Sequence, residues 1–156
     1  MIRSGALAVL LVTLAAACGG DEDEAGEPLL SGSVDGDYDG EAFTAVNGFA
    51  TVADVGPVIV VGDGNVRCGS EDSSVPPSGH GGILRVDAFE VGTYSSLVQV
   101  FDGTDDYEAF GTGGGTVEIT EVSAASIAGS VAWQAVDEED DRTFSLSGSF
   151  EVLLCE

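Results

Sequence analysis

The segment that decides the fold is Thr143-Phe-Ser-Leu-Ser-Gly-Ser-Phe-Glu-Val-Leu-Leu154. Apolar side chains recur at alternate positions, and small, hydroxyl or acidic residues occupy most of the positions between them. Because successive side chains of a strand point to opposite faces, this pattern predicts a β-strand with one buried and one solvated face. The residues expected to face inward are Phe144, Leu146, Phe150, Val152 and Leu154.

The same alternation continues upstream, over residues 116–122 and 127–135. Between residue 135 and the segment above lies the acidic run Asp137–Asp141, which is suited to a solvated turn. The two flanking strands are therefore expected to pair as an antiparallel hairpin. The upstream residues expected to face inward are Val117, Ile119, Ile127, Val131, Trp133 and Ala135.

The rest of the chain indicates an all-β fold, because no segment has a helical period and turns rich in Gly and Asp recur. Gly113-Gly-Gly115 is expected to be one of these turns. We expect an antiparallel β-sandwich or a small up-and-down (meander) barrel of about eight to ten strands, a choice that alternation leaves open. The earlier strands are expected at Gly32–Val34, Glu41–Val46, Gly48–Ala53, Val58–Val61, Ile83–Val91, Tyr94–Phe101 and Tyr107–Phe110.

The beginning of the chain has the pattern of an export signal. Met1-Ile-Arg-Ser4 is short and basic, and Gly5–Ala17 is apolar but shorter than the ~20 residues of a membrane helix. Residues 1–17 are therefore expected to be a signal peptide. Residues 18–28 are acidic and rich in glycine, which predicts a disordered tether, and residues 29–156 are expected to form a single β domain.

Cys18 follows Ala15-Ala-Ala17 directly. This resembles the lipobox of bacterial lipoproteins, in which such a cysteine is lipidated, although Ala15 stands where that motif usually has leucine. Gly19 rather than Asp after the cysteine favours the outer membrane of a Gram-negative cell, by resemblance to such lipoproteins. The same alanines also satisfy the small-x-small rule for ordinary secretion, so a secreted or periplasmic soluble protein is the alternative.

Short motifs of a glycine followed by strand residues recur after the signal: Gly40-Glu-Ala-Phe43, Gly92-Thr-Tyr94, Gly115-Thr-Val-Glu-Ile-Thr120, Gly129-Ser-Val131 and Gly148-Ser-Phe150. With its signal and β-rich pattern, the chain is similar to uncharacterised small β-rich bacterial envelope lipoproteins. The resemblance implies a location and a fold, and it implies no catalytic residues.

The three cysteines predict one disulfide. If Cys18 is lipidated, Cys68 and Cys155 remain as a pair in an oxidising compartment. A metal site at these cysteines is not expected, because there is no Cys-x-x-Cys and the single histidine is His80. His80 stands in a glycine-rich segment and is expected to face solvent.

The strong acidity of the chain limits its partners. The formal net charge is −24, and the sequence contains no lysine. Nucleic acids and anionic membrane surfaces bind clustered Lys and Arg, so neither is an expected partner. We expect contact with a membrane through the lipid anchor, and an unidentified protein or small ligand as partner.

Asp35-Gly-Asp37-Tyr-Asp39-Gly40 matches the first half of a calcium loop, with carboxylates at alternate positions before a glycine. Glu41 would follow with its backbone carbonyl, but Val46 stands where the loop needs a bidentate Glu. These residues are also typical of a hairpin turn, which is the alternative. No cofactor is expected, and calcium is the one candidate.

No motif predicts catalysis. The sequence has no Gly-x-Ser-x-Gly elbow, and no pair of carboxylates stands out as a hydrolytic pair. We therefore expect no enzymatic activity, and a binding or structural role at the cell envelope. The alternatives are a carrier of a small apolar ligand inside a barrel and a hydrolase that works through carboxylates.

Overall fold

The computed structural model describes residues 27–68, 78–104 and 108–155. Across these residues the chain is all-β, as expected, and none of them belongs to a helix of the length and apolarity that crossing a membrane requires. The expected signal peptide and Cys18 lie outside the described residues. The strands are β1 (Ser31–Tyr38), β2 (Glu41–Ala45), β3 (Asn47–Ala53), β4 (Gly56–Gly62), β5 (His80–Arg85), β6 (Gly92–Asp102), β7 (Glu108–Val122), β8 (Ser126–Asp137) and β9 (Arg142–Leu154).

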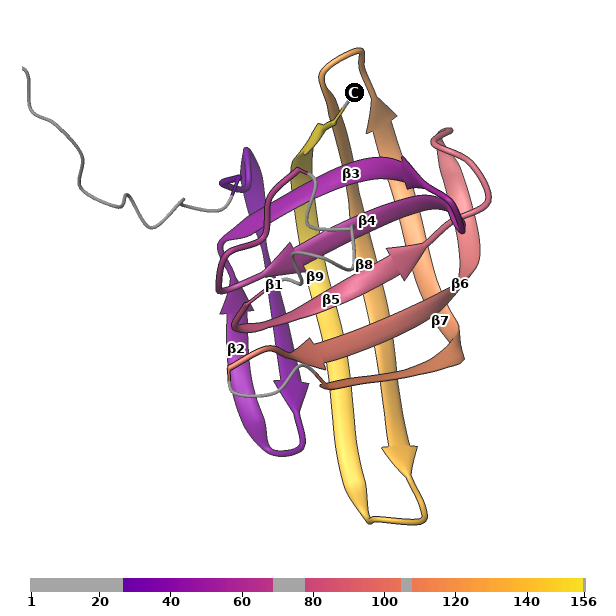
Figure 1. Ribbon diagram of the computed structural model, residues 1–156. Helices are drawn as coiled ribbons and strands as arrows, with labels where there is room; N and C mark the ends of the chain where they lie inside the picture. Colours follow the sequence, from indigo (N-terminus) through magenta and orange to yellow (C-terminus); the bar gives the residue numbers. More distant parts are fainter. Residues whose placement is uncertain (1–26, 69–77, 105–107, 156) are drawn as a thin grey trace, which may run out of the picture.

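All the strands of the described residues belong to one sheet, in the order β2-β1-β9-β3-β4-β5-β6-β7-β8. Because β8 also pairs with β9, the strands from β3 to β9 form a closed, barrel-like ring of hydrogen-bonded neighbours. The β3–β9 pair is parallel, so the sheet is mixed rather than antiparallel throughout. Figure 1 shows β3, β4 and β5 crossing the long strands β8 and β9, with the β1–β2 hairpin beside the ring.

β9 is the strand that three others share. Along one edge, residues 142–153 pair with β8. Along the other edge, residues 144–151 pair with β1, and only Leu153 and Leu154 pair with β3. The closure of the ring therefore depends on a very short parallel contact.

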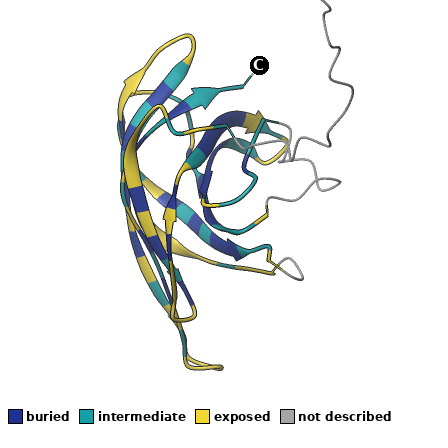
Figure 2. Ribbon diagram, turned by 90° about the vertical axis from the view of Figure 1, so that its left-hand side faces the viewer, coloured by how far each residue is buried: buried dark blue, intermediate teal, exposed yellow. Residues whose placement is uncertain are grey.

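The inner faces of the strands form one continuous core. The expected alternation of β9 is confirmed, since its inward residues are buried and Leu154 packs against them half-buried. Trp133 is only 6% exposed, and it lies in the same cluster as predicted. Figure 2 shows buried and exposed residues alternating along the long strands. The buried side chains of facing strands belong to one contiguous apolar cluster.

A smaller apolar cluster covers the outer side of β3, β4 and β6. Val66, from the segment after β4, is fully buried there, and Cys68 and Cys155 pack against the cluster. β4 is consequently covered on both faces, which explains why Val58–Val61 is an unbroken apolar run rather than an alternating one. The buried members of this cluster are Phe49, Val60, Val66 and Phe101.

β7 differs from the expectation because it is one long strand rather than two. The predicted turn at Gly113-Gly-Gly115 is wrong, since these residues continue the strand. Gly115 serves close packing instead, since a Cβ there would lie 2.4 Å from Val98 Cγ2 of β6, whereas Gly113 and Gly114 lie at an irregularity in the β6–β7 register and Gly114 has a φ of 93°. β5 is also shorter than predicted and ends at Arg85 rather than Val91.

The described chain joins the domain slightly before the expected boundary at residue 29. The Glu27 amide donates to the Val66 carbonyl at 2.8 Å, and the Gly48 amide donates to the Glu27 carbonyl at 2.8 Å. Pro28 forms an isolated bridge with Asn47. The last two residues of the expected tether are therefore held against β3 and the segment after β4.

Candidate functional site

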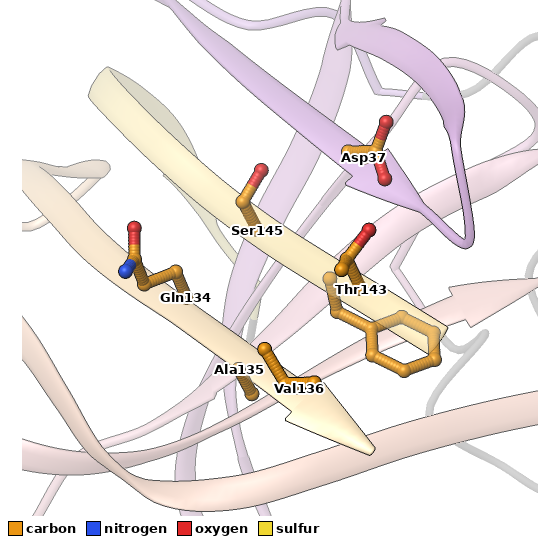
Figure 3. Close-up of a pocket in the computed structure, with 7 residues that line it drawn as sticks. Asp37, Gln134, Ala135, Val136, Thr143 and Ser145 are labelled. Atoms are coloured by element: carbon orange, nitrogen blue, oxygen red, sulfur yellow. The ribbon is translucent and has the colours of Figure 1, made fainter. Parts of the chain in front are cut away.

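A groove of about 560 Å³ opens on β1, β8 and β9 (Figure 3). Its size falls in the range of small-ligand sites. The polar side chains that line it stand on the outer, solvated side of these strands, away from the core. The lining residues are Asp37, Gln134, Ala135, Val136, Thr143, Phe144 and Ser145.

The register of the strands brings the polar side chains of the groove together. Ser145 of β9 lies opposite Asp37 of β1 on one edge and opposite Gln134 of β8 on the other. Side chains at paired positions are about 5 Å apart, so these three residues form a row across the strands. Thr143 stands on the same face of β9 and lies opposite Val136. Figure 3 shows the four polar side chains rising from the same side.

The polar groups of the groove are free to bind a ligand. Within the described part of the chain, the side chains of Gln134, Thr143 and Ser145 have no hydrogen-bond partner. Asp37 Oδ1 accepts a bond from the Gly40 amide at 2.8 Å, which leaves Oδ2 available. Some polar side chains elsewhere on this face are paired: the Thr44 hydroxyl, for example, donates to Asp35 at 2.7 Å.

A second polar cluster surrounds His80 at the start of β5. Its Nε2 lies 3.2 Å from a Glu41 oxygen and 3.6 Å from an Asp102 oxygen, and its Nδ1 lies 3.7 Å from Asp63. The expectation that His80 faces solvent is wrong, because its side chain is only 15% exposed. The cause is non-local, since the cover comes from other strands and not from the neighbouring glycines.

The His80 cluster fastens the β1–β2 hairpin to the ring. The Phe43 ring of β2 stacks on the imidazole at a centroid distance of 5.9 Å, and the Tyr38 ring of β1 lies 6.4 Å away. On the other side, the His80 amide donates to Asp63 Oδ1 at 2.7 Å. Residues of both hairpin strands therefore contact one side chain of β5, which fixes the position of neighbouring Asp37.

Two groups beside this cluster have shifted pKa values. The amide and hydroxyl of Thr104 donate to Asp102 Oδ1 at 2.9 and 2.7 Å, and with the nearby imidazole of His80 they lower the pKa of Asp102. Burial raises the pKa of Tyr38, and the charge and hydrogen bond of Glu108 raise it further. The Tyr38 hydroxyl therefore keeps its proton and donates a hydrogen bond to Glu108 Oε2 at 3.3 Å.

The carboxylates of the proposed calcium loop have separate positions. Asp35 and Asp37 belong to β1, whereas Asp39 lies in the β1–β2 turn with a φ of 53° and Glu41 begins β2. Among the described residues, no group of three or more His, Cys, Asp or Glu is placed to hold a metal ion. The hydrogen bond from Gly40 to Asp37 is typical of the turn alternative. Calcium binding stays a prediction.

Cys68 and Cys155 form the disulfide that the cysteine count predicts. Their Cα atoms are 5.8 Å apart, and the sequence separation is 87 residues. The Cys155 amide also donates to the Ala50 carbonyl of β3 at 2.8 Å. The bridge thus lies beside the contact that closes the ring of strands.

Sequence reasoning missed the groove, although part of its signal was present. The alternation had already placed Thr143 and Ser145 on the solvated face of their strand. The expected hairpin around Asp137–Asp141 would also have set Gln134 opposite Ser145. The position of Asp37 beside Ser145 could not be predicted, because the pairing of β1 with β9 joins segments that are far apart in the chain.

Comparisons of the chain with protein-family models, with curated proteins and with solved structures find no match. The chain forms an all-β domain with a closed mixed sheet and a polar groove on the outside.

Proposed function

We propose that this chain is an exported domain, anchored to the cell envelope through a lipid on Cys18, that binds a polar ligand on its outer face without chemically changing it. One observation carries the proposal: the open groove holds unpaired polar side chains, whereas the buried side chains of the strands form one contiguous apolar cluster.

The packing of the core favours an external ligand over an internal one. An apolar carrier needs a cavity lined by apolar side chains. Here Trp133, Phe144 and Leu146 belong to a single cluster of buried residues that extends across facing strands. The outer groove, in contrast, offers groups whose hydrogen bonds are available.

Two features support export and anchoring. The disulfide fits an oxidising compartment, because cytosolic thiols are kept reduced. The acidic segment before Glu27 gives a spacer between Cys18 and the point where the described chain meets the domain. The same spacer would hold the groove away from the membrane surface.

The anchor is tested by growing expressing cells with a clickable fatty acid and detecting label on the protein. We expect label on the parent, none on Cys18→Ala, and the parent in the outer-membrane fraction. Cys18→Ala is a clean control because it leaves the Cys68–Cys155 bridge intact. Label that persists in this variant, or an unlabelled parent found in soluble fractions, contradicts the anchor.

The binding role is tested by nuclear magnetic resonance, with the isotope-labelled domain titrated with a polar extract of cell envelopes. We expect the side-chain amide of Gln134 and the backbone amides of Thr143 and Ser145 to shift. Shifts confined to core signals such as the Trp133 indole would support the apolar carrier instead. Turnover in a screen of ester and glycan substrates would support the hydrolase.

A further inference from the structure

We propose that the groove of Asp37, Gln134, Thr143 and Ser145 binds a neutral saccharide. This inference rests on the proposed function and names the ligand class for the same site. It is carried by the hydrogen-bonding character of the row across β1, β9 and β8, by the apolar side chain beside it, and by the charge of the chain.

The donors and acceptors of the groove match those of sugar hydroxyls. A sugar hydroxyl donates one hydrogen bond and accepts others, so it needs partners of both kinds. Asp37 Oδ2 accepts only, the Gln134 amide donates and accepts, and the hydroxyls of Thr143 and Ser145 do both. Spaced about 5 Å apart across the strands, the row of three can engage hydroxyls around one sugar ring.

Val136 gives the groove an apolar border. Its side chain is 57% exposed, directly opposite Thr143 on the neighbouring strand. A pyranose presents C–H groups on its faces and hydroxyls around its rim. An exposed aliphatic side chain next to a row of polar groups can contact both parts, and it gains hydrophobic stabilisation that a fully polar surface would not provide.

Charge favours a neutral ligand over an ionic one. The formal net charge of −24 and the carboxylate of Asp37 repel phosphates and acidic sugars. An amine would find only one carboxylate in the groove, with one oxygen already bonded to the Gly40 amide. The remaining polar groups are neutral, which suits a ligand without charge.

The inference is tested by titrating the isotope-labelled domain with three kinds of probe. Neutral probes are maltotriose, cellotriose, mannotriose and triacetylchitotriose; spermidine is the cationic probe and mannose phosphate the anionic one. We expect at least one neutral oligosaccharide to shift the groove signals in a saturable way, and the two ionic probes to leave them unchanged.

Variants assign the binding to the groove. Ser145→Ala and Gln134→Ala should each weaken binding roughly two- to ten-fold, the effect of losing one hydrogen bond. Asp37→Asn keeps the acceptor for the Gly40 amide and tests the negative charge. Ser149→Ala is the matched control, because Ser149 is exposed on the same face of β9 but lies outside the groove. This variant should bind the saccharide as tightly as the parent does.

Each other outcome overturns the inference. If only spermidine or only mannose phosphate binds at the groove, the ligand class is wrong and the binding role stands. If no probe shifts the groove signals but the envelope extract does, the saccharide is again wrong and the binding role stands. If the envelope extract also leaves the groove signals unchanged, the proposed function fails as well. Equal affinities for Ser145→Ala, Gln134→Ala and the parent would place saccharide binding elsewhere.

Discussion

Cys155 is bonded to Cys68 one residue beyond the parallel pair that closes the ring of strands. The β3–β9 contact consists of two residue pairs, followed by the hydrogen bond from Cys155 to the Ala50 carbonyl. So few backbone contacts give a weak junction. The covalent bond holds β9 against β3 at the place where the sheet has the least pairing.

Reduction of this bond should destabilise the domain markedly. Losing a native disulfide of this kind typically costs about 2–5 kcal/mol, because the unfolded chain gains freedom. We expect a lower melting temperature in reductant and a matching loss in a Cys68→Ser, Cys155→Ser double variant, with faster hydrogen exchange at the backbone amide of residue 155, which donates to the Ala50 carbonyl. Two titratable thiols in the untreated native domain would contradict the prediction, as would a melting temperature unaffected by reductant.

Replacing Gly148 by alanine should destabilise the pairing of β1 with β9. Gly148 has a φ of 140°, and a Cβ there would lie 2.2 Å from the Ser33 carbonyl oxygen. We expect Gly148→Ala to lower the free energy of unfolding by about 2 kcal/mol or more in urea denaturation. The neighbouring exposed Ser147 is the control, since Ser147→Ala should stay within about 0.5 kcal/mol of the parent. Equal effects of the two variants would contradict the account of this glycine.

Thr104→Val should raise the pKa of Asp102, because it removes one of the two donors that lower it. A carboxyl whose folded pKa lies below its unfolded value adds stability above the unfolded pKa, and this stability is lost as pH falls through the folded pKa. The variant should therefore be less stable than the parent at neutral pH, with the difference shrinking in acid. Titration of the Asp102 carboxyl signal in both proteins measures this pKa. The same pKa in Thr104→Val and the parent would show that the Thr104 hydroxyl does not lower it.

Calcium should stabilise the domain more than magnesium if the acidic loop binds it. A ligand held only by the folded state raises its stability in proportion to RT ln(1 + [L]/Kd). Screening of the strong negative charge by any divalent ion gives a similar shift, so the melting temperatures must be compared at equal ionic strength. We expect the excess effect of calcium to disappear in Asp37→Asn, Asp39→Asn. If the parent and the double variant respond equally, calcium acts only by screening the charge of the acidic surface, and the prediction of a calcium loop is wrong.

The strands could be predicted from the sequence where one face is buried and the other is exposed to solvent. In β8 and β9 this condition holds along most of the length, so the period of two residues marks the inward positions correctly. It fails in β7, where a run of glycines that usually signals a turn instead lies at an irregularity of one long strand, with Gly115 packed closely against β6. Glycine has two uses, and the sequence alone does not distinguish them.

The sites depend on contacts that a local pattern does not contain. Asp35 and Asp37 alternate as calcium ligands do, but a strand has the same period, and β1 places both on its outer face. His80 meets carboxylates from β2, from the segment after β4 and from β6. The disulfide could be predicted from the sequence, because counting the cysteines requires no knowledge of the fold.

The sharing of β9 among three partners has a consequence for the order in which the chain can fold during synthesis. β9 is translated after β1, β3 and β8, so its pairings with these strands form only once it has been synthesised. Such long-range pairings form slowly, because the closure of large loops precedes any gain from the contact. A nascent chain that lacks residues 142–154 has no closed sheet to adopt. Closure of the ring is therefore one of the last steps as the chain folds during synthesis.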